Sequence, residues 1–247
     1  MAASAPAPAP PPQVQRVRAL LSGDSTSGAN PGWDSAWKES TTPWDGGEAQ
    51  LALLSVLEDE SIGGQFVPSE GTALVAGCGR GYEALVLAER GFETLGVDIS
   101  EEAVAQAEKW LASQPDSLAR ERVDFMVQDF FALDFAMDLC FDHTFFCALP
   151  PSWRPRWAET YARIIMPGGV LIAVVYPIKG PNAGPDGPPV NSPLMPPSWF
   201  LKFNVAPEHY KELLSADFEL QWEGIPPKQK ESRVGMEQVQ IWKRKCP

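Results

Sequence analysis

A glycine-rich turn that follows a short hydrophobic run constrains the fold of this chain more than any other feature. The run Thr72–Ala76 (TALVA) passes directly into Gly77, Gly79 and Gly81, and a helical pattern begins at Tyr82. Glycine allows positive φ and lets the backbone approach a ligand closely, and a helix start offers unpaired N–H groups. The sequence therefore predicts a strand, a tight turn and a helix that together form one side of a ligand site.

The spacing of these glycines separates the possible ligands. A dinucleotide-binding turn has the pattern GxGxxG, whereas here the third glycine comes one residue early and Tyr82 holds its place. The spacing thus disfavours a nicotinamide-dependent oxidoreductase, an alternative that a thermal-shift screen with nucleotides would test. The sequence contains neither GxxxxGKS nor GxxxxGKT, so a P-loop is excluded.

Short apolar runs alternate with helical patterns through the middle of the chain, as in a sheet built from strand–helix–strand units. The order predicts an α/β fold with a seven-stranded, doubly wound sheet that is mostly parallel and ends in antiparallel late strands. The predicted strands are Thr72–Ala76, Glu93–Asp98, Val123–Gln128, Phe141–Cys147, Gly169–Tyr176, Phe218–Ile225 and Gln238–Trp242. The predicted helices are Tyr82–Arg90, Ser100–Ala112, Trp153–Ile165 and Pro207–Ala216.

Two irregular stretches, one at the start of the chain and one after the fifth predicted strand, decide the expected domain organisation. We expect one domain over residues 31–247 and a disordered tail over residues 1–30, because the chain opens with a run of Ala and Pro. This opening lacks the basic start and the leucine-rich run of a secretory signal. Seven prolines lie between Ile178 and Pro197, so we expect residues 178–205 to form a long loop near the ligand site.

Charge and cysteine usage limit the partners and the compartment. The chain has 20 basic and 32 acidic side chains and a formal net charge of -12, which argues against nucleic acid and anionic membrane surfaces as partners. No apolar run reaches the roughly 18 residues of a membrane span. Four cysteines without CxxC spacing and two histidines without an HExxH pattern predict neither a disulfide framework nor a metal site. We expect a cytoplasmic monomer that acts on a small molecule.

Two carboxylates end the next two predicted strands. Asp98 follows the glycine turn by ~20 residues, where a carboxylate can accept hydrogen bonds from both hydroxyls of a ribose. Asp129 ends the third strand, beside Phe130 and Phe131. Each has a simpler explanation, since Asp98 can help to cap a helix and Asp129 can be a solvated strand end. Their occurrence together at successive strand ends favours a bound cofactor, because open α/β sheets bind ligands there.

The GxGxG turn and these carboxylates resemble the first motifs of class I methyltransferases that use S-adenosylmethionine. The resemblance implies that the amino-acid portion of the cofactor lies over Gly77 and Gly79 and that Asp98 binds its ribose. It also implies that Asp129 contacts the adenine amino group and that Phe130 packs on the adenine ring. The expected sheet is accordingly the Rossmann-like sheet of class I methyltransferases.

Three tryptophans precede the first strand. Trp33 and Trp37 lie four residues apart and would share one face of a helical turn, and Trp44 follows. They could be a packing staple, but aromatic faces also suit a cationic sulfonium. With GCGRGY, GVDIS, QDFF, FDHTFFCALPP and RPRWAE, this pattern resembles the thiol, thiocyanate and halide methyltransferase branch of the thiopurine methyltransferase family. The likeness covers nearly all of residues 33–245 and implies a cofactor site of Trp33, Trp37, Trp44, Gly77, Asp98, Asp129, Phe130 and His143.

The chain departs from that branch at two places. Its members usually have tyrosine where this chain has His143, and the stretch over residues 179–205 is longer and richer in proline than their loop, so the acceptor pocket is expected to differ. His143 could act as a general base, hydrogen-bond the cofactor carboxylate, or be structural. Arg154 aligns with an arginine that the wider family places near the acceptor pocket, and a solvated arginine at a helix start explains it equally.

The resemblance implies in-line transfer of the methyl group of S-adenosylmethionine to a small soft nucleophile: a thiol, hydrosulfide, thiocyanate or halide. Because the electrophile is already cationic, alignment, desolvation and exclusion of water should supply most of the catalysis. We expect Cys78 and Cys147 to be packing residues rather than covalent nucleophiles. Two alternatives stay open, namely an enzyme of the same fold that methylates phenol oxygen and a non-catalytic module that binds the cofactor.

Overall fold

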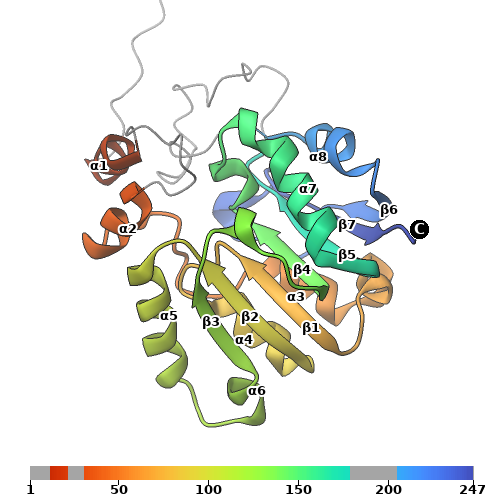
Figure 1. Ribbon diagram of the computed structural model, residues 1–247, viewed down its shortest axis with the longest axis horizontal. Coiled ribbons are helices and arrows are strands. Elements are labelled where there is room, and N and C mark those ends of the chain that lie inside the picture. Colours follow the sequence, from red (N-terminus) through yellow and green to blue (C-terminus); the bar gives the residue numbers. More distant parts are fainter. Residues whose placement is uncertain (1–11, 22–30, 179–204, 247) are drawn as a thin grey trace, which may run out of the picture.

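A seven-stranded sheet forms the centre of the computed structural model, which describes residues 12–21, 31–178 and 205–246 (Figure 1). The strand order is β3-β2-β1-β4-β5-β7-β6; strands β1 to β5 pair in parallel, and β7 lies antiparallel between β5 and β6. The expected doubly wound α/β sheet with late antiparallel strands is confirmed. The strands are β1 Gly71–Ala76, β2 Phe92–Asp98, β3 Val123–Val127, β4 Met137–His143, β5 Ile165–Val175, β6 Phe218–Gly224 and β7 Gln238–Arg244.

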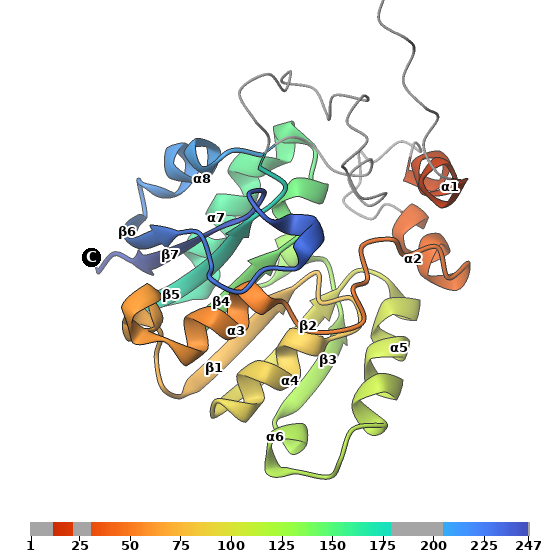
Figure 2. The same ribbon diagram turned by 180° about the vertical axis from the view of Figure 1, so that it is seen from behind.

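Helices cover both faces of this sheet, as the front and back views show (Figures 1 and 2). Helices α7 and α8 lie on one face, and α3 and α4 lie on the other. Successive side chains of a strand point to opposite faces of the sheet, so each central strand contributes to the hydrophobic core on both faces. Along β1, Leu74 and Ala76 enter one core, while Ala73 and Val75 enter the other. The helices are α1 Pro12–Leu21, α2 Pro31–Lys38, α3 Leu51–Glu58, α4 Tyr82–Glu89, α5 Glu101–Ala112, α6 Leu118–Glu121, α7 Arg154–Ile164 and α8 Pro207–Leu214.

The strand order fixes where a ligand can bind. The chain runs from β1 outward to β2 and β3 and then returns to β4 on the other side of β1. The connections on the two sides of β1 therefore leave the sheet toward opposite faces and open a crevice at the carboxyl ends of these strands. The glycine turn follows β1, Asp98 ends β2 and His143 ends β4. All three therefore lie at the carboxyl ends of strands that border this crevice.

Three sequence predictions need correction. The predicted strand Phe141–Cys147 is shifted: β4 begins at Met137 and ends at His143, because Thr144 adopts a φ of 58° and Phe146–Ala148 forms a short 3-10 helix. The expected disordered tail contains α1 within residues 12–21, while residues 1–11 and 22–30 lie outside the described part of the chain. Helix α3 was not predicted from the sequence. Residues 179–204 of the expected loop lie outside the described residues.

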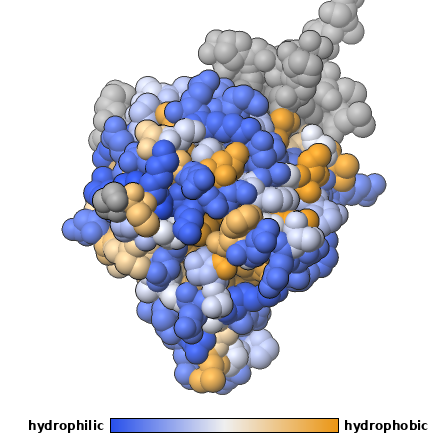
Figure 3. Space-filling model, turned by 90° about the vertical axis from the view of Figure 1, so that its right-hand side faces the viewer, coloured by the Kyte–Doolittle hydropathy of each residue, from blue (hydrophilic) through white to orange (hydrophobic). Residues whose placement is uncertain are grey.

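Within residues 12–21, 31–178 and 205–246, no helix has the length and apolarity that crossing a membrane requires. The face shown in Figure 3 is mainly hydrophilic, and its apolar residues form small groups.

Candidate active site

One cavity of about 310 Å³ lies at the carboxyl ends of β1, β2 and β4, where the crevice was expected. It has the size of a small-molecule pocket and is lined by apolar and aromatic side chains with a few polar groups, as such pockets are. The structure brings together in its wall every cofactor residue that the sequence predicted: Trp33, Trp37, Trp44, Gly77, Gly79, Asp98, Asp129, Phe130 and His143.

The glycine turn is part of the cavity wall, and its backbone cannot accommodate other residues there. Gly77 and Gly79 have φ values of 58° and 53°, in the left-handed region that glycine adopts without strain. A Cβ atom on Gly77 would lie 2.7 Å from the Phe145 ring, and one on Gly79 would lie 3.2 Å from the Trp37 ring. The turn is therefore pressed between two aromatic rings and leaves its peptide groups at the cavity wall.

Asp98 is fixed by two backbone donors and still has acceptor capacity. Its Oδ2 accepts from Gly79 N at 3.0 Å, and its Oδ1 accepts from Ser100 N at 3.0 Å. Burial raises the pKa of Asp98, while these N–H groups act in the opposite direction. A carboxylate has about four lone-pair sites, so roughly two remain for a ligand diol. The alternative that Asp98 only caps a helix is weakened, because Ser100 Oγ is the group that accepts from Ala103 N at the start of α5.

Asp129 and Phe130 form the next part of the wall. Asp129 Oδ1 accepts from Phe131 N at 3.0 Å, so the carboxylate caps the short 3-10 helix Phe130–Ala132. The Phe130 ring packs at 5.0 Å from Phe145 and 4.9 Å from Tyr161, between ring centroids. Asp129 therefore both caps this short helix and lines the cavity. Phe130 is held by its aromatic neighbours and forms an apolar surface in the cavity wall.

The three tryptophans pack against one another in the cavity wall, and we call this group the tryptophan cover. The Trp44 ring lies 5.3 Å from Trp33 and 6.2 Å from Trp37, in edge-to-face contacts. Asp45 ties this cover to the glycine turn, because its carboxylate accepts from Arg80 Nε at 2.7 Å and from Tyr82 Oη at 3.0 Å. Burial, and to a lesser extent the same carboxylate, raise the pKa of Tyr82.

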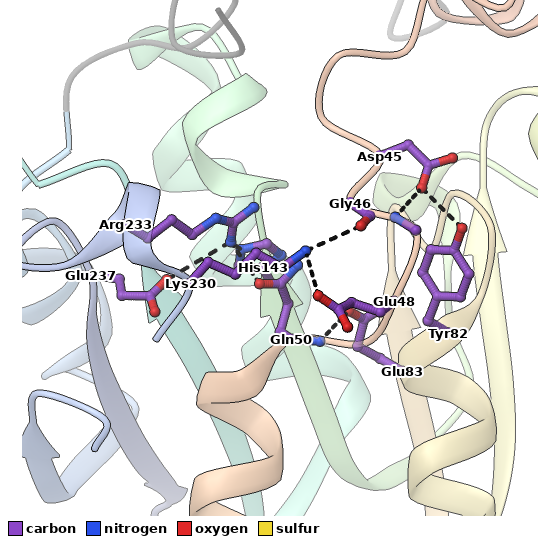
Figure 4. Close-up of polar contacts among 11 residues, drawn as sticks. Asp45, Gly46, Glu48, Gln50, Tyr82, Glu83, His143, Lys230, Arg233 and Glu237 are labelled. Atoms are coloured by element: carbon purple, nitrogen blue, oxygen red, sulfur yellow. Dashed lines mark hydrogen bonds and ion pairs between the residues drawn. The ribbon is translucent and has the colours of Figure 1, made fainter. Parts of the chain in front are cut away.

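His143 is part of a buried polar cluster that the sequence did not reveal (Figure 4). Arg233 Nη1 lies 2.8 Å from His143 Nε2 and 2.6 Å from Gln50 Oε1. The backbone N–H of Gln50 donates in turn to Glu83 Oε1 at 3.1 Å, at the start of α4. Arg233 lies in a connection rich in charged residues, and nothing in that sequence distinguishes the two that are buried, Arg233 and Glu237, from the others.

Arg154 does not line the cavity. Its guanidinium lies 4.6 Å over the Phe146 ring, its Nη1 lies 3.5 Å from His209 Nδ1, and burial lowers its pKa. Arg154 is buried rather than solvated, so the simple surface explanation does not hold, and a role toward the acceptor stays a prediction.

The two inner cysteines lie in packed surroundings. Cys147 is in the core beside Phe146, and Cys78 is buried at the glycine turn. Burial raises the pKa of the Cys78 thiol, which keeps it protonated and a poor nucleophile. Both observations support packing roles.

Comparison with known proteins agrees with this arrangement. The sequence model described as Thiopurine S-methyltransferase (TPMT) matches residues 29–244. A probable thiol methyltransferase 2 of Arabidopsis thaliana is 34% identical over 70% of this chain and 73% of its own length. Thiocyanate methyltransferase 1 of the same plant is 36% identical over 62% of this chain, which spans 65% of that relative.

Solved structures share the fold. The chain superimposes on the 1,6-didemethyltoxoflavin-N1-methyltransferase of Burkholderia thailandensis with a TM-score of 0.61 and 19% identity, over 99% of this chain and 94% of the other. A SAM-dependent methyltransferase of Methanosarcina mazei gives a TM-score of 0.58 at 20% identity, over 74% of this chain and 97% of the other. The expected class I sheet, the S-adenosylmethionine dependence and the enzyme class are confirmed by these matches taken together. The chain belongs to the thiopurine S-methyltransferase family.

Proposed function

We propose that this chain transfers the methyl group of S-adenosylmethionine to a small soft nucleophile, namely a thiol, hydrosulfide, thiocyanate or halide. One observation carries the proposal: a single cavity joins the glycine turn, the Asp98 carboxylate and the tryptophan cover to an aromatic inner wall. When bound, the cofactor supplies a methyl group on a cationic sulfur. The residues of this chain bind it, orient the acceptor and exclude water.

The cavity residues fit this cofactor by their chemistry. Asp98 retains acceptor sites that suit a ribose diol, and the Phe130 ring suits the face of a purine. The rings of Trp33 and Trp44 suit a sulfonium, because aromatic faces attract cations. The site roles of these residues, including Trp37, Gly77, Gly79 and Asp129, are part of the proposal.

The acceptor side of the cavity favours a soft nucleophile over a strongly hydrated one. Beyond His143, the wall consists mainly of apolar side chains, which cannot replace lost water by hydrogen bonds: Phe131, Phe145, Ala148, Leu149, Pro150 and Trp153. A thiolate, thiocyanate or iodide loses hydration more readily than an alkoxide, and desolvation increases its reactivity. This wall therefore selects acceptors that tolerate an apolar site.

The relatives support the same order of acceptors. The thiol and thiocyanate methyltransferases are 34% and 36% identical to this chain, whereas a 2-heptyl-1-hydroxyquinolin-4(1H)-one methyltransferase of Mycobacteroides abscessus is 30% identical. Because this chain spans 73%, 65% and 63% of these relatives, each of their acceptors must be tested directly. A phenol or hydroxyquinolone acceptor is the second candidate.

The test combines cofactor binding with an acceptor panel. Calorimetry with S-adenosylmethionine and S-adenosylhomocysteine measures binding, and methyl transfer is then assayed with iodide, thiocyanate, hydrosulfide, a small thiol, a phenol and a hydroxyquinolone. We expect binding of both compounds and the fastest transfer to a sulfur acceptor or iodide. Faster transfer to the phenol or the hydroxyquinolone would replace the proposed acceptor class, and binding without any transfer would indicate a non-catalytic module.

Asp98→Asn tests the cofactor site itself. The amide keeps the shape and one acceptor but loses the charge, and a hydrogen bond to a charged group contributes about 1.5–3 kcal/mol, so the Kd for S-adenosylmethionine should rise roughly ten- to a hundredfold. Asp124→Asn is the matched control, because Asp124 is an exposed carboxylate on neighbouring β3. Equal affinities of the two variants would remove Asp98 from the cofactor site.

A further inference from the structure

His143 ends β4 and lines the cavity, yet one edge of its ring is directed to a buried arginine rather than to the cavity (Figure 4). Arg233 is 7% exposed, and its Nη1 lies 2.8 Å from His143 Nε2. The same Nη1 lies 2.6 Å from Gln50 Oε1, and the guanidinium lies 4.5 Å over the Tyr176 ring. The arginine is therefore held from three sides and cannot swing away without breaking these contacts.

The contact between Arg233 and His143 fixes the position of the histidine proton. A guanidinium carries only N–H donors and has no acceptor. A nitrogen 2.8 Å from it must therefore accept, so Nε2 of His143 carries no hydrogen in this arrangement. A neutral imidazole holds its one hydrogen on the other nitrogen, Nδ1. The ring then has no vacant lone pair, since Nε2 accepts from Arg233 and Nδ1 is protonated.

The charged groups around this pair preserve the neutral state. Arg233 approaches from the connection between β6 and β7, and Glu237 of the same connection lies 3.8 Å from its Nη1. Glu83 of α4 accepts from the Gln50 N–H. Lys230 is directed away, to Glu48 Oε1 at 3.1 Å and to Gly46 O. Of these groups, Arg233 is the one in direct contact with Nε2, and its positive charge disfavours a second positive charge on the ring.

We infer that Arg233 is a positioning residue that locks His143 as a neutral Nδ1–H donor, so that His143 does not act as the general base. The inference rests on the proposed function for its catalytic consequence. A thiol acceptor must then lose its proton without the help of His143, and in this scheme it enters the cavity as a thiolate formed in solvent. The thiolate sulfur forms the new S–C bond while the bond from methyl to the cationic sulfur breaks, and the electron pair of the broken bond stays on that sulfur.

The proton position can be measured without turnover. The chain has two histidines, so ¹⁵N-edited NMR of the full-length protein resolves both rings, and loss of one signal set in His209→Gln assigns His143. We expect the Nδ1–H tautomer for His143, unchanged from about pH 8 to about pH 6, although an ordinary histidine with a pKa of about 6.5 would be mostly charged at the lower value. An Nε2–H tautomer or an imidazolium at about pH 7 would overturn the inference.

Two variants separate positioning from simple packing. Arg233→Lys retains a donor and should keep the Nδ1–H tautomer, whereas Arg233→Leu removes the donor and should free Nε2, so that the ring also populates the Nε2–H tautomer or the imidazolium. A leucine variant that keeps the wild-type tautomer and does not titrate would show that Arg233 does not control the ring. If the leucine variant does not fold, the wild-type and lysine spectra still decide the question.

Kinetics test the catalytic consequence in the wild-type enzyme. For two thiols of different pKa, kcat/KM should rise about tenfold per pH unit below the pKa of each thiol, and it should stay within about twofold over the same range for thiocyanate. A shared apparent pKa for both thiols, independent of their own values, would restore an enzymic base and overturn the inference. Absence of turnover with every acceptor would instead refute the proposed function, and the NMR result would stand separately.

Discussion

At the scale of single residues, two buried carboxylates show how differently the fold treats the same chemical group. Asp142 accepts from Trp157 Nε1 at 2.7 Å, Tyr161 Oη at 3.0 Å and Phe146 N at 3.2 Å, yet burial still raises its pKa to about 6. Glu83, at the cavity, accepts from Gln50 N, and burial raises its pKa to about 7. Asp142 thus accepts from three donors, two of which belong to α7, whereas Glu83 has weaker support.

The raised pKa of Glu83 makes stability depend on pH. The folded protein keeps this proton up to about pH 7, whereas the unfolded chain loses it near 4.5, so the folded state binds more protons between these values. The contribution of Glu83 to the free energy of unfolding is therefore present below about pH 4.5 and is lost as the pH rises to about 7, by an amount on the order of 3 kcal/mol. Glu83→Gln keeps an acceptor for the Gln50 N–H and removes this loss.

Urea unfolding at several pH values measures the effect. Between about pH 5 and about pH 8, the stability of Glu83→Gln relative to wild type should increase, because only the wild type must ionise the buried Glu83 carboxyl, whereas both proteins must ionise Asp142. Glu89→Gln, an exposed position on the same helix α4, is the control and should follow the wild type. An identical pH slope for Glu83→Gln and wild type would contradict the prediction.

At the scale of elements, Gly81 in the turn from β1 to α4 is required for two separable reasons, its left-handed backbone conformation and the lack of space for a Cβ atom. Gly81 has a φ of 79°, and a Cβ atom there would lie 2.3 Å from Phe125 Cζ. Gly47 has nearly the same φ, 75°, but a Cβ atom there would meet nothing within 4 Å. The two positions therefore share the conformational requirement and differ only in the space around them.

This pair gives a prediction for the turn. Gly47→Ala should cost about 1 kcal/mol, the usual cost of a left-handed residue with a Cβ. Gly81→Ala should cost about 1–3 kcal/mol more, because Phe125 must move to relieve the overlap. Urea denaturation of both variants measures the difference. Equal losses would show that φ alone, and not the contact with Phe125, requires glycine at position 81.

At the scale of the whole molecule, two segments that lie far apart in the sequence meet beside the cavity. The connection between β6 and β7 contacts the segment before β1 through three cations: Lys228 pairs with Glu58, Lys230 with Glu48, and Arg233 with Gln50. The first two pairs are exposed and contribute little stability. The third is buried, so Arg233 links Gln50, in the segment before β1, to His143 at the end of β4.

The charge of the molecule predicts its state of association. A net charge of -12 and the mainly hydrophilic face in Figure 3 oppose contact between copies, so we expect a monomer with a sedimentation mass of 27.0 kDa. The exposed Met126 and Val127 on edge strand β3 are the place where a second copy could pair. A sedimentation mass twice that value would contradict the prediction, and Val127→Lys would then test whether this edge is the interface.

The sequence by itself determined the sheet and brought together the residues of the proposed cofactor site. Strand periodicity and glycine spacing are local properties, and the carboxyl ends of parallel strands share one edge, so Gly77, Asp98 and Asp129 had to lie together. Only the tertiary structure decided the surroundings of His143. Arg233 lies 90 residues from His143 and 183 from Gln50 in the sequence, and the connection that carries it has no periodicity. Which of its charged side chains becomes buried depends on packing between distant segments, and that packing has no local signal.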